Sequence, residues 1–106
     1  MPKYNKLVRD LIPDLIKLTG KTPVTRTLSE QEYVAMLKRK LQEETKEYME
    51  AEDDFEALKE LADIVEVVRA LAKLHYVTYD KVEEIREKKE KERGAFDDRI
   101  FLMEVK

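Results

Sequence analysis

Apolar residues recur every three or four positions along most of the chain, with charged residues between them. This spacing gathers apolar side chains on one face of a helix that has about 3.6 residues per turn. It predicts three main helices, over residues 30–52, 55–75 and 79–93. Polar residues suited to capping precede each helix: Ser29, which forms a capping-box motif with Glu32, then Asp53 or Asp54, and Thr78.

The segments outside these helices have a different pattern. Residues 7–18, "LVRDLIPDLIKL", predict a short helix that ends at Gly20, with Pro13 tolerated only in its first turn. Residues 23–28 and 99–105 have no helical period and contain β-branched or aromatic residues. These two segments are therefore candidates for a small two-stranded element.

We predict an all-α fold in a single domain spanning residues 1–106: an antiparallel bundle of three main helices plus a short N-terminal helix. Charged and hydrophobic residues each make up 42% of the chain, with only 2 Gly and 3 Pro, which is typical of amphipathic helices. A net charge of −3 argues against nucleic acid as a partner. A chain without cysteine can form neither disulfides nor thiolate metal sites.

Localisation and assembly follow from the same pattern. No apolar run approaches the roughly 20 residues that a membrane span requires, and "MPKYNKLVRD" lacks the apolar core of a signal peptide. We therefore expect a cytoplasmic protein with no membrane partner. A small helical domain this highly charged is also expected to bury part of its surface in a homo-oligomer.

Carboxylates fall where the apolar faces of two helices should lie. In residues 30–52, Glu44 lies inside the apolar arc, Glu47 on its flank and Glu43 on the outer side. In residues 55–75, Glu60 lies inside the arc and Asp63 at its edge. Two helices joined by a short turn pack antiparallel, so both carboxylate pairs should face one interface.

Like charges at a shared interface are unfavourable unless they are paired. Basic side chains or divalent cations can supply the pairing, and hard cations such as Mg²⁺ prefer oxygen ligands. Each acidic pair taken singly is common on a solvated helix face. Two pairs in phase with apolar stripes on adjacent helices favour a metal site.

Four stretches of the sequence resemble a known superfamily. "EETKE" (residues 43–47) and "ELAD" (residues 60–63) resemble the EExxE…ExxD pattern of the all-α nucleoside triphosphate pyrophosphohydrolases, which include the MazG proteins. "YNKLVRDLIPDLI" and "KKEKERGAFDDRIFL" resemble the MazG-related, phosphoribosyl-ATP pyrophosphohydrolase-like branch. The resemblance covers nearly the whole chain.

The resemblance implies a function and a set of site residues. It implies hydrolysis of the α–β phosphate bond of a nucleoside triphosphate or phosphoribosyl-ATP, giving a monophosphate and pyrophosphate. It assigns Mg²⁺ or Mn²⁺ to Glu44, Glu47, Glu60 and Asp63, and a catalytic role to Glu43, Glu44 and Glu47, with Glu43 as a base or an outer-shell group. Such proteins form homodimers or homotetramers. The substrate stays open, with housecleaning of non-standard nucleotides preferred.

Basic residues are candidates for binding the substrate phosphates. Arg86, Lys89 and Arg93 share one stripe of the helix over residues 79–93. The alternative is that they pair with acidic residues of the same highly charged helix. Lys6 and Arg9 are further candidates, supported mainly by the resemblance.

Other functions remain possible from the sequence alone. One is a non-catalytic helical module for nucleotide binding or dimerisation, and another is an inactive homologue that binds nucleotide without cleaving it. A di-iron carboxylate bundle is disfavoured because it needs a Glu three residues before a ligating His, and position 72, three before His75, is Ala.

Overall fold

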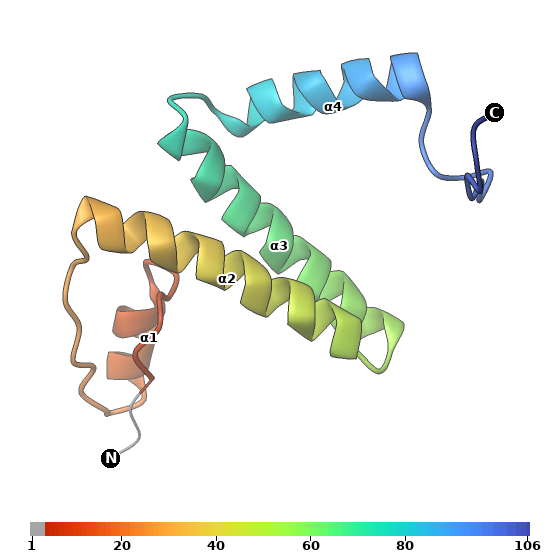
Figure 1. The fold of residues 1–106 in the computed structure, drawn as a ribbon. Helices are drawn as coiled ribbons and strands as arrows, with labels where there is room; N and C mark the ends of the chain where they lie inside the picture. The colour runs from red at the N-terminus through yellow and green to blue at the C-terminus, as the bar shows by residue number, and fades with distance from the viewer. Residues whose placement is uncertain (1–3) are drawn as a thin grey trace.

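The computed structural model describes residues 4–106, which form four α-helices and no β-strand (Figure 1). The all-α prediction is confirmed, and the three main helices end within two residues of their predicted bounds. None of these helices combines the length and the apolar character that a membrane span requires. The helices are α1 (Ile12–Leu18), α2 (Glu30–Glu50), α3 (Asp54–Leu74) and α4 (Tyr79–Arg93).

Capping residues fix where the helices begin. Ser29 forms the predicted capping box with Glu32: its Oγ accepts from the Glu32 N–H at 3.2 Å, and its own N–H donates to Glu32 Oε1 at 3.1 Å. Asp53 caps α3 by accepting from the Glu56 N–H at 2.8 Å. Thr78 occupies the N-cap of α4 without a side-chain hydrogen bond.

The N-terminal helix is shorter than predicted. It begins at Ile12, so that Pro13 lies in its first turn, where a missing N–H leaves no hydrogen bond unmade. Gly20 follows its C-cap with a φ of 84°, a value that favours glycine. Arg9, ahead of the helix, donates a hydrogen bond to Asp63 on α3 and so connects this segment to the bundle.

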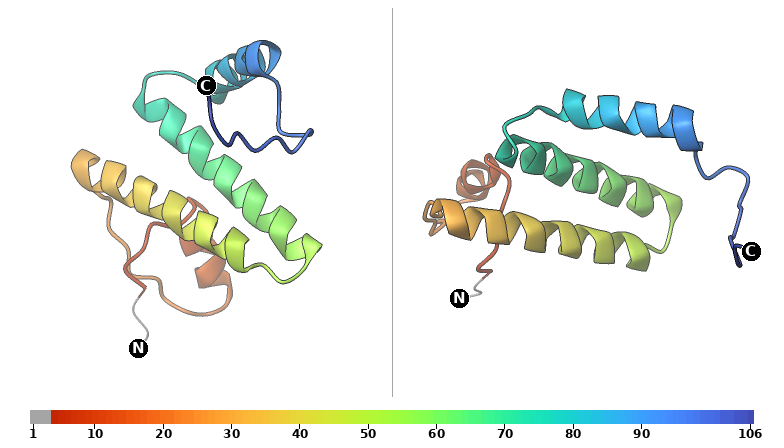
Figure 2. Two further views of the ribbon diagram at one scale, coloured as in Figure 1. Left: turned by 45° about the vertical axis from the view of Figure 1, so that its right-hand side comes forward. Right: turned by 45° about the horizontal axis from the view of Figure 1, so that its top comes forward.

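The three long helices are stacked with α3 in the middle (Figure 2). A connection of three residues makes α2 and α3 an antiparallel hairpin, and α4 packs on α3 from the other side. Among the described residues, the buried ones are few: Leu37 and Glu44 on α2, and Val67 and Ala72 on α3. A carboxylate is therefore one of the four most buried residues of the fold.

The two-stranded element considered for residues 23–28 and 99–105 does not form among the described residues. The two segments lie at opposite ends of the molecule in each view, because α4 carries the chain away from α1 and α2 before residue 99 (Figures 1 and 2). The β-strand preference of both segments was therefore not enough to predict that they pair.

Candidate metal centre

Three carboxylates meet between α2 and α3. Glu44 and Glu47 come from α2 and Glu60 from α3, and each offers an oxygen within 4.8 Å of the other two. Ligands on opposite sides of a Mg²⁺ ion are about 4.2 Å apart, twice the usual Mg–O distance. Only one pair among three ligands can be opposite, and adjacent ligands are about 3 Å apart, so some of these oxygens need to close by up to about 1.8 Å to share one such ion.

Glu44 is the most buried member of this cluster, with 6% of its surface exposed. Its Oε1 lies 3.4 Å from Lys40 Nζ, whereas its Oε2 is buried and has no hydrogen-bond partner. Leaving a buried acceptor unpaired costs about 1–3 kcal/mol. Glu60 Oε2 is likewise buried and unpartnered. A bound cation or a proton could pair with these two unpartnered carboxylate oxygens.

Helix phase explains why Glu44 faces inward and Glu43 does not. Glu44 follows the buried Leu37 by seven residues, close to two turns, and so lies on the same face. The carboxylate of Glu43 instead lies 3.7 Å from Arg39 and 3.8 Å from Lys40, outside the cluster. The predicted burial of Glu44 is confirmed, whereas Glu43, predicted to face solvent, is half-buried and Glu47, predicted on the flank of the buried arc, is exposed.

Repulsion between the clustered carboxylates changes the pKa of Glu60. The close Glu44 carboxylate, partial loss of hydration and the nearby Glu47 carboxylate raise the pKa of Glu60 to about 7, from an ordinary value of 4.5. A proton is therefore held on Glu60 to a higher pH than on an ordinary glutamate.

Asp63, the fourth predicted metal ligand, is not part of the three-carboxylate cluster. It lies one turn after Glu60 on α3, and its Oδ1 accepts a hydrogen bond from Arg9 at 2.6 Å. This ion pair is accessible to solvent, with 58% of the Arg9 side chain and 38% of the Asp63 side chain exposed. Arg9, predicted to bind phosphate, thus neutralises a predicted metal ligand.

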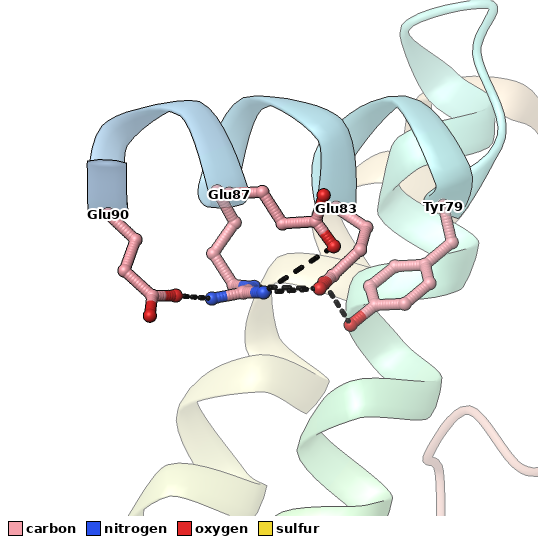
Figure 3. A network of polar contacts seen from close by, with 5 residues as sticks. Tyr79, Glu83, Glu87 and Glu90 are labelled. Carbon is pink, nitrogen blue, oxygen red and sulfur yellow. Dashed lines mark hydrogen bonds and ion pairs between the residues drawn. The ribbon is translucent and has the colours of Figure 1, made fainter. Parts of the chain in front are cut away.

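The other predicted phosphate ligands do not lie at the cluster. The guanidinium of Arg86 is held by Glu83 at 2.6 Å and by Glu90 at 2.6 Å, both on its own helix (Figure 3). Lys89 and Arg93 are exposed on the same helix, which α3 separates from α2 (Figure 2). Lys6 instead stacks over the Tyr4 ring at 5.6 Å. For Arg86, pairing with acidic residues of α4, the alternative reading, is what the structure shows.

Two lysines near the carboxylates were missed from the sequence. Lys40 bridges Glu43 and Glu44 from one turn earlier on α2, a spacing of four residues that the sequence displays. Lys59 belongs to a hollow of about 320 Å³ beside the cluster, at the lower end of the volumes that bind small ligands. The hollow is lined by Glu47, Glu50, Ala51, Glu56, Lys59 and Glu60.

No protein-family model matches this chain, and no solved structure matches it. Over 47 residues the chain is 55% identical to an uncharacterized protein of Mycolicibacterium smegmatis. The matched region covers 44% of this chain and 48% of that relative, so the chain spans about half the length of the curated relative it matches. Its function must therefore be argued from the chemistry of the site.

Proposed function

We propose that this protein is a divalent-metal-dependent nucleotide pyrophosphohydrolase, which cleaves the α–β phosphate bond to give a monophosphate and pyrophosphate. One observation carries the proposal: the buried Glu44, whose Oε2 has no hydrogen-bond partner, clusters with Glu47 and Glu60. The resemblance of "EETKE" and "ELAD" to the pyrophosphohydrolase pattern connects that cluster with this reaction.

In the proposal, Glu44, Glu47 and Glu60 hold Mg²⁺ or Mn²⁺, with Asp63 joining them when Arg9 releases it. A cation bound there would supply Lewis-acid chemistry, by neutralising phosphate oxygens and lowering the pKa of an attacking water. Lys40 anchors Glu44, and Glu43 in turn holds Lys40, which makes Glu43 an outer-shell group. Hydrolysis by water needs no nucleophilic side chain, consistent with a chain without cysteine.

We assign the substrate to the hollow beside the cluster. Glu47 and Glu60 line both features, and because Glu50 and Glu56 also line the hollow, a phosphate chain could extend into it only with its charge neutralised by the bound cation. Lys59 and Arg9 are the nearby cations that would contact its phosphates. The substrate class is a nucleoside triphosphate or phosphoribosyl-ATP, and we propose housecleaning of nucleotides in the cytoplasm as the role.

Hydrolysis of a nucleotide panel tests the proposal. Canonical, deoxy- and oxidised nucleoside triphosphates and phosphoribosyl-ATP would be incubated with Mg²⁺ or Mn²⁺, and pyrophosphate and orthophosphate quantified separately. We expect metal-dependent pyrophosphate release that falls at least about tenfold in Glu44→Gln, since even the outer-shell partners of a metal contribute about 10–100-fold. Glu66→Gln, which removes an exposed carboxylate from α3, is the matched control and should retain activity.

The alternative outcomes are distinct. Orthophosphate as the only product would mean that a different bond is cleaved. Nucleotide binding without turnover would favour the non-catalytic module. Equal activity in Glu44→Gln and Glu66→Gln would exclude the carboxylate cluster as the active site.

A further inference from the structure

Lys40 contacts the buried Glu44 from one turn earlier on α2. Its Nζ lies 3.4 Å from Glu44 Oε1 and 3.8 Å from Glu43 Oε2. Only 23% of the Lys40 side chain is exposed, against 75% for Lys46, which makes an ion pair of the same spacing with Glu50 on the same helix. Burying a charged group is unfavourable unless the charge is paired. Lys40 is therefore held beside Glu44, whereas Lys46 extends into solvent.

The stability of α2 does not explain this position of Lys40. A lysine four residues before a glutamate is the weaker of the two possible orders for a helix, because the reverse order suits the helix dipole better. Glu43 does not require Lys40 either, since its other oxygen, Oε1, lies 3.7 Å from Arg39. The distinctive neighbour of Lys40 is thus the buried carboxylate of Glu44, a member of the three-carboxylate cluster.

The contact with Lys40 makes the two oxygens of Glu44 unequal. Oε1 faces the ammonium group, while Oε2 is buried and has no hydrogen-bond partner. A cation that takes Oε2 alone leaves the ion pair with Lys40 intact. A cation that takes both oxygens must displace Lys40 or lie close to its positive charge, and repulsion between like charges is strong where water is excluded.

We propose that Lys40 makes Glu44 a one-oxygen ligand and thereby selects Mg²⁺ or Mn²⁺ against Ca²⁺. This inference rests on the proposed function and gives a specificity-determining role to a residue outside the set of ligands. Mg²⁺ has a small octahedral shell in which it keeps several waters, so one oxygen from each carboxylate is enough. Ca²⁺ takes about six to eight oxygens and often binds both oxygens of a carboxylate. Lys40 withholds one of the oxygens that this larger shell needs.

Competition between metal ions tests the role of Lys40 in Lys40→Met, which removes the ammonium group and keeps a long unbranched side chain. Bound Mn²⁺, followed by electron paramagnetic resonance, would be displaced by Mg²⁺ and by Ca²⁺ in separate titrations. Loss of a positive charge should strengthen the binding of both ions, so the ratio of the two affinities isolates the effect on selectivity. We expect the affinity for Ca²⁺ relative to Mg²⁺ to rise about tenfold, on the scale of other outer-shell partners of metals.

Lys46→Met is the matched control, because it removes a lysine from the same helix and from an ion pair of the same spacing. Its affinity ratio should equal that of the natural protein. An equal ratio in Lys40→Met as well would overturn the inference and leave the metal centre in place. Failure of the natural protein to bind Mn²⁺ would instead overturn both the metal centre and the role of Lys40.

A second measurement needs no variant. Removing Lys40 leaves the buried Glu44 carboxylate without its paired charge, and a change of this kind destabilises a fold. The natural protein alone therefore provides an independent test. Mg²⁺ gives up its waters reluctantly, so a site of flexible carboxylates would bind Ca²⁺ more tightly. We expect Ca²⁺ to displace Mn²⁺ from the natural protein no more readily than Mg²⁺ does. Tighter binding of Ca²⁺ than of Mg²⁺ would contradict the selective role of Lys40.

Discussion

The guanidinium of Arg9 lies 2.6 Å from the carboxylate of Asp63, although 54 positions separate the two residues in the chain. This ion pair connects the segment before α1 to α3, one turn from the Glu44–Glu47–Glu60 cluster. It also neutralises a carboxylate that the family resemblance assigns to a cation. In the proposed function, Arg9 and the cation compete for Asp63.

This competition leads to the first prediction, for Arg9→Gln. Without Arg9, Asp63 is free to join the cluster, and Mg²⁺ should bind about two- to fivefold more tightly, since exposed ion pairs contribute up to about 1 kcal/mol. The kcat/KM for the nucleotide should nevertheless fall, because a phosphate-binding cation is lost. Calorimetric titration with Mg²⁺ measures the affinity. Arg26→Gln, which removes the exposed arginine paired with Glu32, serves as the control.

An unchanged or weaker Mg²⁺ affinity in Arg9→Gln would show that Asp63 and the cation do not compete. Asp63 would then be a structural partner of Arg9, and the site would consist of the three clustered carboxylates alone.

The second prediction concerns the stability of Glu44→Gln. The amide keeps the size of the side chain and removes a buried charge whose Oε2 has no partner. In chelator, the melting temperature should therefore stay level or rise. Addition of Mg²⁺ should raise the melting temperature of the natural protein and not that of the variant, because only a binding-competent native state is stabilised by ligand. A clear loss of stability in chelator would show that the Lys40–Glu44 pair stabilises the fold.

The third prediction is a pH dependence that arises from Glu60. Its pKa is about 7 in the folded state against an ordinary 4.5, so between these values the folded protein binds more protons than the unfolded chain. The free energy of unfolding in chelator should therefore fall as the pH rises from 4.5 to 7. Saturating Mg²⁺ should oppose this fall, because a cation binds the deprotonated carboxylate and displaces the proton.

Urea denaturation at several pH values measures this effect, and Glu60→Gln provides the control, in which the fall should be smaller. Glu32 does not obscure it: hydrogen bonds from Arg26 and from the Ser29 N–H lower the pKa of Glu32 to about 2. Its contribution is lost only below pH 4.5. A rise in stability from pH 4.5 to 7 in chelator would contradict the account of Glu60.

The fourth prediction concerns the beginning of α2. Ser29→Ala removes the hydroxyl that accepts from the Glu32 N–H and should destabilise the protein by about 1 kcal/mol. Thr78→Ala is the matched control, since Thr78 holds the N-cap of α4 without a side-chain hydrogen bond and should lose less. Thermal or urea denaturation distinguishes the two variants. An equal loss in both would mean that the capping box contributes little.

Features set by local spacing could be predicted from the sequence. Apolar periodicity and the capping residues Ser29 and Asp53 located the helices, because both signals act within one or two turns. Helix phase alone predicted the burial of Glu44, although it did not rank the exposure of Glu43 and Glu47 correctly. The pairing of Arg86 with Glu83 and Glu90 was visible in the same way, at spacings of three and four residues, and remained an alternative.

Features set by tertiary placement could not be predicted. Helix phase relates only residues of one helix, whereas Arg9 and Asp63 lie on different segments. The path of the chain between them brings them together, and helix phase does not predict that path. The pairing of residues 23–28 with residues 99–105 was wrong for the same reason: strand preference indicates which segments can pair, not whether the chain brings them to one place. The direction of α4 keeps residues 99–105 away from residues 23–28. It also separates Arg86, Lys89 and Arg93 from the carboxylates.

Binding of Mn²⁺ followed by electron paramagnetic resonance tests the central claim most directly, since free Mn²⁺ is quantified without reference to any substrate. The natural protein and Glu44→Gln would be titrated under identical conditions, with Glu66→Gln as the control. The account predicts that the natural protein and Glu66→Gln take up at least one Mn²⁺ per chain and that Glu44→Gln binds at least about tenfold more weakly. Equal uptake by all three proteins would show that Glu44 is a buried carboxylate without a cation, and the proposed metal centre would be wrong.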